Sequence, residues 1–478
     1  MAADRSPSHP RQRPRSRQRP QSRQRPQSRQ RRESAHSRDS RNGHTLPPPN
    51  THPNFKRGLQ AQDKRAPWVR PEGESGRSGF HPIHFTYISF KSTSRASLLC
   101  NFLWPVVPAA IAVRYALPDH HTLIFTLAYI AMVPCANMIG FAGQELARKF
   151  PHVWGVLTEI TCGSVVEIVL FMVLLAKDQF YVIKAAILGS ILATMVLCLG
   201  ACFFVGGLLK DEQTFSDAIS EAGSGLLLTA GVVLAVPTIF EHGLNTTDLS
   251  TEGLDHKLLQ ISRVISVLLI IAYAVYAFFQ ARTHHGIYEA IFAFDEARDD
   301  DKHKEEAKPK LTLTESIIAL TISIALVTLI AIILVLQIEP VIENGDVSDA
   351  FMGLILVPLV EKIAEHLTAM DEAWDNQMNF ALSHVLGATL QTALFTGPLS
   401  VIVGWGLDKN MDLSFDVFHL VMLILAILTV GRFLQDQKSN YLEGFLLLIL
   451  YFAIAVAAWY YPDPAHATEG GSASEGEH

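Results

Sequence analysis

Charged side chains are scarce in this chain of 478 residues: Asp, Glu, Lys and Arg make up 18% of it, whereas hydrophobic residues make up 49%. The charges gather at the N-terminus, in short loops and in one acidic insert, so that long stretches between them contain almost none. A run of about 20 apolar residues is long enough to cross the hydrocarbon layer of a bilayer. The scarcity of charge therefore argues against a soluble protein and predicts an integral membrane protein.

Cysteine is also rare, and the motifs of several enzyme classes are missing. The five cysteines show no paired spacing in a loop, so the sequence implies neither a disulfide framework nor a zinc site. We find no His-Glu-x-x-His pair, no nucleophile elbow and no glycine-rich phosphate loop, which argues against an intramembrane enzyme.

What the sequence does contain is a series of apolar segments of membrane-spanning length. They predict an all-α polytopic membrane protein with about 11 transmembrane helices. The candidate spans are 96–117, 120–143, 153–176, 180–206, 217–240, 258–281, 312–336, 348–371, 377–405, 415–432 and 441–460.

Residues 1–95 differ from the rest because they repeat an Arg-Gln-Arg-Pro-Gln-Ser unit and contain almost nothing that could form a core. This composition predicts a disordered cytosolic tail that contacts anionic membrane lipid. A transit peptide is the alternative for such an Arg- and Ser-rich terminus, but tandem prolines fit an amphipathic helix badly.

The basic residues of the short loops predict the orientation of the chain. With a cytosolic N-terminus, Arg148, Lys149, Lys210, Arg282, Lys310, Arg432 and Lys438 fall on the cytosolic side. The opposite side then has mainly Arg114, Lys177, Lys257 and Lys409, together with a sequon at Asn245. This excess favours a cytosolic N-terminus, and an odd number of spans puts the acidic tail 462–478 in the lumen.

An internal repeat organises the spans. The segment from Gly163 to Leu192 aligns without a gap with the segment from Glu361 to Leu390, which superposes Glu167 on Glu365. Five helices separate equivalent elements, so the second copy must cross the membrane in the opposite sense, as in many secondary transporters. The predicted organisation is a leading helix at 96–117, a first repeat at 118–281, an acidic cytosolic linker at 282–311 and a second repeat at 312–461.

Charged residues inside two spans mark the candidate site. At about 100° per residue, Glu361, Glu365, Thr368 and Glu372 fall on one stripe of a helix. A carboxylate at the bilayer centre costs roughly 2.5–3.5 kcal/mol, so this stripe must face a protein interior or a water-filled cavity. Asp371 and Glu372, near the end of the span, are expected at the membrane surface.

The equivalent span of the first repeat has the same arrangement. Glu159, Gly163 and Glu167 lie four residues apart on one helix face, and Gly163 lets another helix or an ion approach the backbone. Two carboxylate-bearing helices can therefore meet across one cavity. A purely structural buried carboxylate is the alternative for each of these acids.

Several segments, in order, resemble the cation/proton exchanger family, typified by vacuolar Ca²⁺/H⁺ antiporters of the calcium/cation antiporter superfamily. They include "GFAGQELARKF", "GSVVEIV", "AAILGSIL", "CFFVGGLLKDEQTFSDA", "GLILVPLVEKIAEH" and "LGATLQTALFTGPLSVIVGW". The resemblance implies alternating access across an endomembrane such as the vacuole, with Ca²⁺ as the transported cation and H⁺ as the counter-ion. It implies no cofactor and no nucleic-acid partner.

The resemblance also implies which residues hold the cation. Glu167 and Glu365 match the glutamates of the family's two Gly-Asn-x-x-Glu motifs and are the expected cation ligands, and Gln391 matches a polar residue of the second repeat. The acidic stretch from Phe294 to Lys308 resembles the family's segment between the halves, although an ordinary solvated loop is an equal alternative.

The chain departs from the family at five positions. Ser164 and Lys362 stand where the two motifs have Asn, Glu361 stands where the second motif has Gly, Thr194 stands where the family has Asn, and Ile332 replaces a Glu. The Lys362 ammonium can reach Glu365, three residues away, and could take the place of a bound cation, neutralise Glu361, or act as a structural counter-ion.

These considerations define the predicted site. His366 and His384 are interpreted first as packing or hydrogen-bonding partners, and His366 also as a modulator of the site. Two alternatives to Ca²⁺/H⁺ exchange remain: a transport-inactive relative that acts as a regulator or scaffold, and an exchanger of a monovalent or another divalent cation. The predicted ion- and proton-binding residues are Glu167, Glu365, Glu159, Glu361, Gln391 and Ser164, with Lys362 and His366 as modulators.

Overall fold

The computed structural model describes residues 75–91, 95–244, 251–298, 308–343 and 347–461. Within these ranges the regular secondary structure is helical except for two short strands. Residues 1–74 and 92–94 of the predicted disordered tail 1–95, the sequon at Asn245, most of the acidic insert and the tail 462–478 lie outside the described residues. Residues 75–91 of the predicted tail are described and include the helix α2 (Pro82–Lys91), so the prediction of disorder is wrong for this part.

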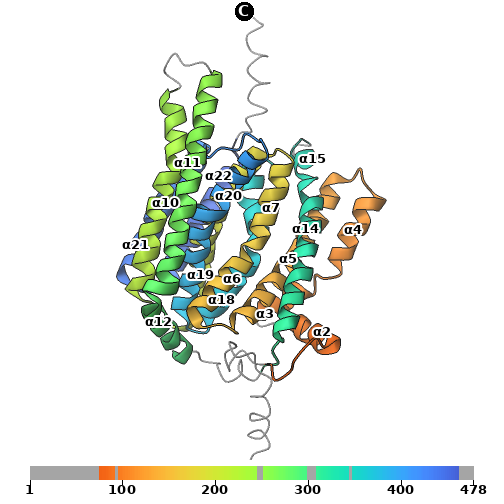
Figure 1. Ribbon diagram of the computed structural model, residues 1–478, viewed down its shortest axis with the longest axis vertical. Helices are drawn as coiled ribbons and strands as arrows, with labels where there is room; N and C mark the ends of the chain where they lie inside the picture. Colours follow the sequence, from red (N-terminus) through yellow and green to blue (C-terminus); the bar gives the residue numbers. More distant parts are fainter. Residues whose placement is uncertain (1–74, 92–94, 245–250, 299–307, 344–346, 462–478) are drawn as a thin grey trace, which may run out of the picture. The chain divides into compact units, whose positions relative to one another are not determined.

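The elements from α2 to α12 precede the acidic insert, and Figure 1 shows them in orange to green. Pro134 and Pro237 lie inside two of its longest helices. The elements are α2 (Pro82–Lys91), α3 (Arg95–Asn101), α4 (Val106–Ala116), α5 (His121–Ala147), α6 (His152–Gly163), α7 (Val165–Ala176), α8 (Phe180–Leu192), the π-helical turn η3 (Ala193–Cys198), α9 (Leu199–Leu209), β1 (Gln213–Thr214), α10 (Asp217–Leu244), α11 (Thr251–Phe278), η4 (Phe279–Thr283) and α12 (His285–Arg298).

The second half begins with α14, whose N-terminus has a complete capping box formed by Thr312 and Glu315. Asp416 and Asn440 cap α21 and α22 in a similar way. The elements are α14 (Leu313–Val335), α15 (Ile338–Glu343), α16 (Asp349–Phe351), η5 (Met352–Leu356), α17 (Val357–Glu361), α18 (Ile363–Trp374), α19 (Met378–Gln391), η6 (Thr392–Thr396), α20 (Gly397–Gly406), α21 (Val417–Phe433), the 3₁₀ turn η7 (Leu434–Asp436), β2 (Lys438–Ser439) and α22 (Tyr441–Trp459).

Ten helices among the described residues are long and apolar enough to cross a membrane. They include every predicted span except 348–371, and the all-helical, polytopic fold is confirmed. The remaining span is present as the helical run α16 to α18, which is broken at Lys362 and has Glu361, Lys362 and Glu365 at the break. These charged residues set it apart from the apolar helices.

The two copies of the repeat share their irregularities as well as their helices. α6 ends at Gly163 and α7 begins at Val165, while at the aligned positions α17 ends at Glu361 and α18 begins at Ile363. Each copy then has a turn residue with positive φ, Asp178 at 61° and Asn376 at 63°. The π-helical turns η3 and η6 follow at matching places. The internal repeat predicted from the sequence is therefore confirmed in the backbone.

The contacts of these turns show that the copies have opposite directions. Asp178, after α7, accepts a hydrogen bond from Lys409, which follows α20, at 2.7 Å. Asn376, after α18, instead contacts Gln213, which follows α9, at 3.5 Å, and Arg298 of α12 at 3.3 Å. The helical run α8 to α9 begins just after Asp178 and ends just before Gln213, so these two residues lie at opposite ends of it. Asn376 contacts Gln213 and therefore lies at the opposite end from Asp178, which means that the repeat is inverted.

Glycines allow the broken helix of the second repeat to lie close to α8. A Cβ added at Gly189 would stand 2.2 Å from the Leu354 carbonyl oxygen, and one added at Gly353 would stand 2.5 Å from the Ala185 Cβ. Both contacts are too short for any larger residue, so α8 and η5 approach backbone to backbone. This packing fixes the broken helix against the first repeat.

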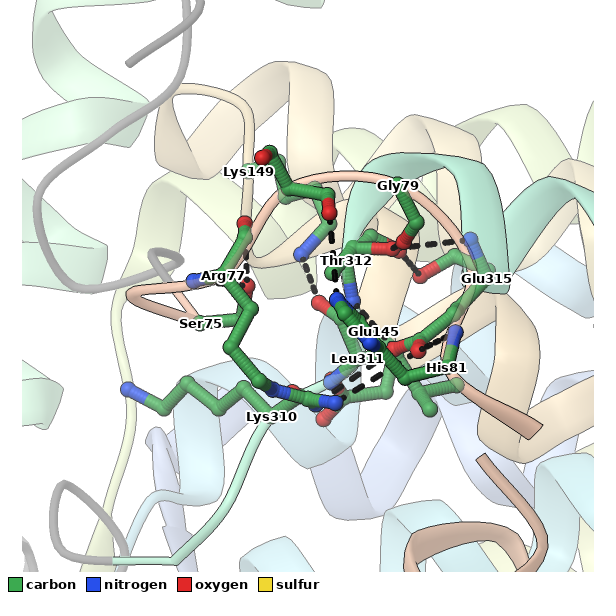
Figure 2. Close-up of polar contacts among 12 residues, drawn as sticks. Ser75, Arg77, Gly79, His81, Glu145, Lys149, Lys310, Leu311, Thr312 and Glu315 are labelled. Carbon is green, nitrogen blue, oxygen red and sulfur yellow. Dashed lines mark hydrogen bonds and ion pairs between the residues drawn. The ribbon is translucent and has the colours of Figure 1, made fainter. Parts of the chain in front are cut away.

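The segment after the N-terminal tail is tied to the start of α14 (Figure 2). Arg77 donates to the Lys310 carbonyl oxygen at 2.8 Å and pairs with Glu315 at 3.4 Å. Glu145 accepts from the Leu311 backbone N–H at 2.7 Å, and Lys149 donates to the Leu311 carbonyl oxygen at 2.8 Å. Burial lowers the pKa of the Lys149 ammonium. These contacts join the start of α14 to the end of α5.

The predicted acidic linker 282–311 begins with a packed helix, α12. Asp295 is fully buried and accepts hydrogen bonds from the Asn379 backbone N–H at 2.7 Å and from its side-chain amide at 2.8 Å. Burial raises the pKa of the Asp295 carboxyl, against the lowering effect of these bonds. His152 lies between Glu289 and Glu296, at 2.5 and 2.7 Å. This part of the linker is therefore a structural element rather than a solvated loop.

Candidate ion-binding site

The candidate site lies where the broken helices of the two repeats meet. A Cβ added at Gly163, the last residue of α6, would stand 2.6 Å from the Glu365 Oε1 atom. The Glu365 carboxylate of α18 therefore lies directly against the backbone at the break of the first repeat. Glu167 and Glu365 each occupy the first turn of a short helix, where the positive end of the helix dipole stabilises a carboxylate.

Glu167 is completely buried and has three side-chain donors. Ser190 of α8 donates to its Oε1 atom at 2.8 Å, and Thr392 of η6 donates at 2.8 Å. The Lys362 ammonium donates to its Oε2 atom at 3.0 Å. Ser190 belongs to the same repeat as Glu167, whereas Thr392 and Lys362 belong to the other. The two repeats therefore share this carboxylate.

Lys362 lies between the two glutamates of the repeated motif. Its Nζ atom is 3.0 Å from Glu167 and 3.2 Å from Glu365, and its side chain is 1% exposed. The predicted contact with Glu365 is confirmed, and the contact with Glu167 is the shorter of the two. Because burying an ammonium is costly unless it is paired on all sides, these two carboxylates hold Lys362 in place.

Other buried oxygens near the helix breaks have no hydrogen-bond partner among the described residues. They are both carboxylate oxygens of Glu361, the Thr194 hydroxyl and the Gln391 carbonyl oxygen. Leaving such buried oxygens without a partner is unfavourable unless a bound ligand interacts with them. All are oxygen donors, which hard cations prefer, so the donor set fits a transported cation such as Ca²⁺.

The remaining predicted residues have different surroundings. The Ser164 hydroxyl donates to the Ile160 carbonyl oxygen at 3.0 Å, one turn back on α6. His366 is buried, and its Nε2 atom has no hydrogen-bond partner among the described residues. Glu159 lies beside His384, 3.4 Å from its Nε2 atom, one helical turn from Gly163.

The stripe expected on one continuous helix is interrupted at Lys362, so that Glu361 ends α17 and Glu365 lies in the first turn of α18. Within α18, Glu365 and Thr368 line one cavity, as the stripe predicts. Glu372, expected at the membrane surface, lies in the last turn of α18, and its carboxylate pairs with His384 Nδ1 at 2.7 Å. Its side chain is 16% exposed, because a partner on α19 supplies a polar contact that water would otherwise provide. Its position at the membrane surface stays a prediction.

Among the described residues, no group of three or more His, Cys, Asp or Glu side chains is arranged to hold a metal ion. A cation between Glu167 and Glu365 would therefore need hydroxyl, amide or backbone oxygens as further ligands. In this conformation the Lys362 ammonium occupies the space between the two carboxylates.

Comparisons with known proteins give the class to which this arrangement belongs. The family model described as "Sodium/calcium exchanger protein" matches residues 120–282 and 315–460. Vacuolar cation/proton exchanger 2 of Arabidopsis thaliana is 31% identical over 366 residues, which cover 76% of this chain and 81% of that protein. A vacuolar calcium ion transporter of Schizosaccharomyces pombe is 30% identical over 340 residues, covering 71% and 79%.

Solved structures agree with this assignment. The Ca²⁺/H⁺ antiporter protein YfkE superposes with a TM-score of 0.61 at 25% identity, covering 77% of this chain and 100% of that one. The H⁺/Ca²⁺ exchanger CAX shares the fold, with a TM-score of 0.52. The chain belongs to the sodium/calcium exchanger family, and its relatives are cation/proton antiporters. It is a member of a transporter family and not an enzyme.

Sequence reasoning did not find Ser190 and Thr392 as partners of Glu167. A signal was present, because both residues lie one helical element away from a motif glutamate, next to Gly189 and Gln391 in the aligned segments. Their aligned mates are Ala388 and Thr194, so the second repeat has only one equivalent hydroxyl. A search of the two aligned segments for hydroxyl side chains one helix after each glutamate would have found them.

The close contact of Gly163 with Glu365 gives a first prediction. In Gly163→Ala the new methyl group would collide with the Glu365 carboxylate and displace it from Lys362. We expect transport to fall about 100-fold, since a displacement of about 1 Å in a preorganised site costs that much. Gly225→Ala, where a Cβ meets nothing within 4 Å, is the matched control in a vesicle flux assay. Equal flux in both variants would contradict the contact.

Proposed function

We propose that this chain exchanges Ca²⁺, or a related hard cation, for protons across an endomembrane such as the vacuolar membrane, by alternating access between its inverted repeats. Its relatives named as vacuolar exchangers support the compartment and the coupling. Oxygen donors at the helix breaks support a hard cation.

The observation that carries the proposal is the position of Glu167 and Glu365, one from each repeat, on opposite sides of one positive charge. Carboxylates that bind either a cation or protons couple the two by competition, because protonation releases the cation and cation binding releases protons. During transport the Lys362 ammonium must move aside or share the carboxylates with the substrate cation.

A transport-inactive relative is the second candidate, and Lys362 is the observation that favours it. A permanently bound ammonium would occupy the site as a tethered cation and lock the two repeats together. Such a protein would act as a regulator or scaffold. An exchanger of a monovalent cation is a further variant, since one positive charge already neutralises part of the site.

The deciding experiment is flux through the purified chain in reconstituted vesicles. A pH gradient is imposed, and uptake of Ca²⁺, other divalent cations and monovalent cations is measured in parallel. Uptake of Ca²⁺ that depends on the gradient supports the proposal. Uptake of another cation alone changes the substrate, and no uptake of any cation supports the inactive relative.

The orientation is a separate prediction, because it rests on the basic residues of the loops. An epitope tag at the N-terminus is expected in the cytosol and a tag at the C-terminus in the lumen, as read by antibody access to intact and permeabilised vesicles. Two tags on the same side would contradict an odd number of spans.

A further inference from the structure

His384 lies between two carboxylates from different helices, next to the candidate site. Its Nδ1 atom is 2.7 Å from the Glu372 Oε2 atom on α18, and its Nε2 atom is 3.4 Å from the Glu159 Oε2 atom on α6. The histidine itself, on α19, is 6% exposed. A buried imidazole with an acid on each side can gain a proton at one nitrogen and lose one at the other.

A small cavity joins Glu159 and His384 to Glu365. It has a volume of about 20 Å³ and is lined by Glu159, Gly163, Glu365, Thr368 and His384, among others. The Glu159 Oε1 and His384 Nε2 atoms have no hydrogen-bond partner among the described residues. A volume of this size holds one water molecule. A single water in this cavity can pass a proton between His384 and Glu365.

The exposure of the carboxylates falls from this group toward the inner site. The side chains of Glu159 and Glu372 are 18% and 16% exposed, Glu365 is 11% exposed, and Glu167 is 0% exposed. A proton entering from water would therefore meet Glu159 or Glu372 first and Glu365 next. This order gives proton transfer a direction, from Glu159 and Glu372 toward Glu365.

The other helices packed against α19 add little charge near His384. On α12, Asp295 bonds Asn379 at the start of α19, more than one turn away from the histidine. On α8, Lys184 pairs with Asp412. The segments η3, α9 and η6 contain no Asp, Glu, Lys, Arg or His, and on α10 Asp217 and Glu221 are exposed and Glu241 bonds Ser414. The Cys198 thiol of η3 lies near Glu365 and Glu372, and Asp371 of α18 lies near Glu372. The acids nearest His384 are Glu159 from α6 and Glu372 and Glu365 from α18.

We propose that Glu372, His384 and Glu159 form a proton relay that loads and unloads Glu365. Glu372 takes a proton from water and passes it to Nδ1 of His384, and the imidazolium releases its Nε2 proton through a water molecule to the Glu365 carboxylate. Glu159 stabilises the imidazolium between these steps. The transport part of this proposal rests on the proposed proton-coupled exchange, whereas the titration of the group does not.

The first test follows protonation directly, with no need for transport. Infrared difference spectra of the purified protein are recorded across a pH series for the wild type, His384→Gln and Glu372→Gln. We expect imidazole and carboxyl bands that titrate together in the wild type, and loss of this joint transition in both variants. An unchanged carboxyl transition in His384→Gln overturns the relay. If one variant does not fold, the other gives the same comparison.

The second test separates proton transfer from cation binding. In reconstituted vesicles, His384→Gln is expected to lower proton-driven Ca²⁺ uptake at least about tenfold and to remove a step from its pH profile. Isotopic Ca²⁺/Ca²⁺ exchange, which needs no proton transfer, is expected to stay within about twofold of the wild type. Equal losses in both assays overturn the relay, because they indicate a structural role.

His419→Gln is the matched control, since His419 is a buried histidine of α21 outside this group, with an Nε2 atom that also has no hydrogen-bond partner among the described residues. It is expected to keep the wild-type pH profile, and the same altered profile in this variant overturns the assignment to His384. If the wild type transports no cation, the proposed exchange is wrong but the proposed relay is still open. The infrared titration then tests the relay by itself.

Discussion

Replacing Glu167 or Glu365 by glutamine is expected to abolish proton-driven cation flux, reducing it to the level of empty vesicles. A neutral amide can neither release a proton nor balance the charge of a cation. Both residues lie within 3.2 Å of the same ammonium, so each contributes to one shared site. The flux assay described above measures the effect. Wild-type flux in both variants would contradict the assignment of Glu167 and Glu365 as ion- and proton-binding residues.

The two substitutions should differ in stability. Glu167 is completely buried and has the shorter contact with Lys362, so Glu167→Gln leaves the ammonium with one carboxylate instead of two. Breaking a buried ion pair costs about 3–5 kcal/mol, and this value is the upper limit here because Glu365 remains. Glu365→Gln should cost less, since its side chain is partly exposed. Melting temperatures of the two variants give the comparison.

A control separates loss of the site from loss of any buried acid. Glu145, in the last turn of α5, is also buried, at 2% exposed, but its carboxylate accepts from the backbone N–H of Leu311 and not from Lys362. Glu145→Gln keeps one acceptor oxygen for that bond and is expected to transport normally. If the Glu167 variant does not fold, Glu365→Gln carries the test.

The repeat and its two glutamates could be predicted because they depend only on local pattern. A gap-free alignment fixes which residues are equivalent, and the odd number of helices between them fixes the inversion. The break at the aligned positions of Gly163 and Glu361 was also implicit, since a glycine in one copy and a charge in the other both interrupt an apolar helix. The apolar spans followed from composition in the same way.

The partners of the site could not be predicted in the same way. Thr392 reaches Glu167 across 225 positions, and His384 reaches Glu159 and Glu372 from a third helix. Helical periodicity gives the face on which a side chain lies but not which helix packs against that face. The interruption of the stripe between Glu361 and Glu365 was missed for a related reason, because a periodicity argument assumes a continuous helix.

Removing the ammonium of Lys362 is expected to increase cation affinity. If Glu167, Glu361 and Glu365 are ionised, Lys362 neutralises one of their three charges and leaves two, the charge that one divalent cation balances. Lys362→Asn, which restores the residue of the related family, leaves an excess of negative charge at the site. The remaining carboxylates should then bind cations or protons more tightly, by at least about tenfold or about 1.4 kcal/mol.

Thermal stability with and without Ca²⁺ separates this idea from its competitor. A cation that binds the folded protein raises its melting temperature, and tighter binding raises it further at the same concentration. The charge-balance hypothesis therefore expects a larger Ca²⁺-induced shift in Lys362→Asn than in the wild type. If Lys362 only ties α18 to α7, the variant has a lower melting temperature and an unchanged shift, which would defeat the hypothesis.

Lys184→Asn is the matched control, because it removes another lysine of a membrane helix whose ammonium pairs with an acid, Asp412, outside the site. It is expected to leave the Ca²⁺-induced shift unchanged. The double variant with Glu361→Gly and Lys362→Asn removes one carboxylate and one ammonium, so the net charge of the site stays at its wild-type value. If charge alone sets affinity, the double variant should bind Ca²⁺ less tightly than Lys362→Asn. If the wild type is inactive because Lys362 blocks the site, the double variant should gain proton-driven flux.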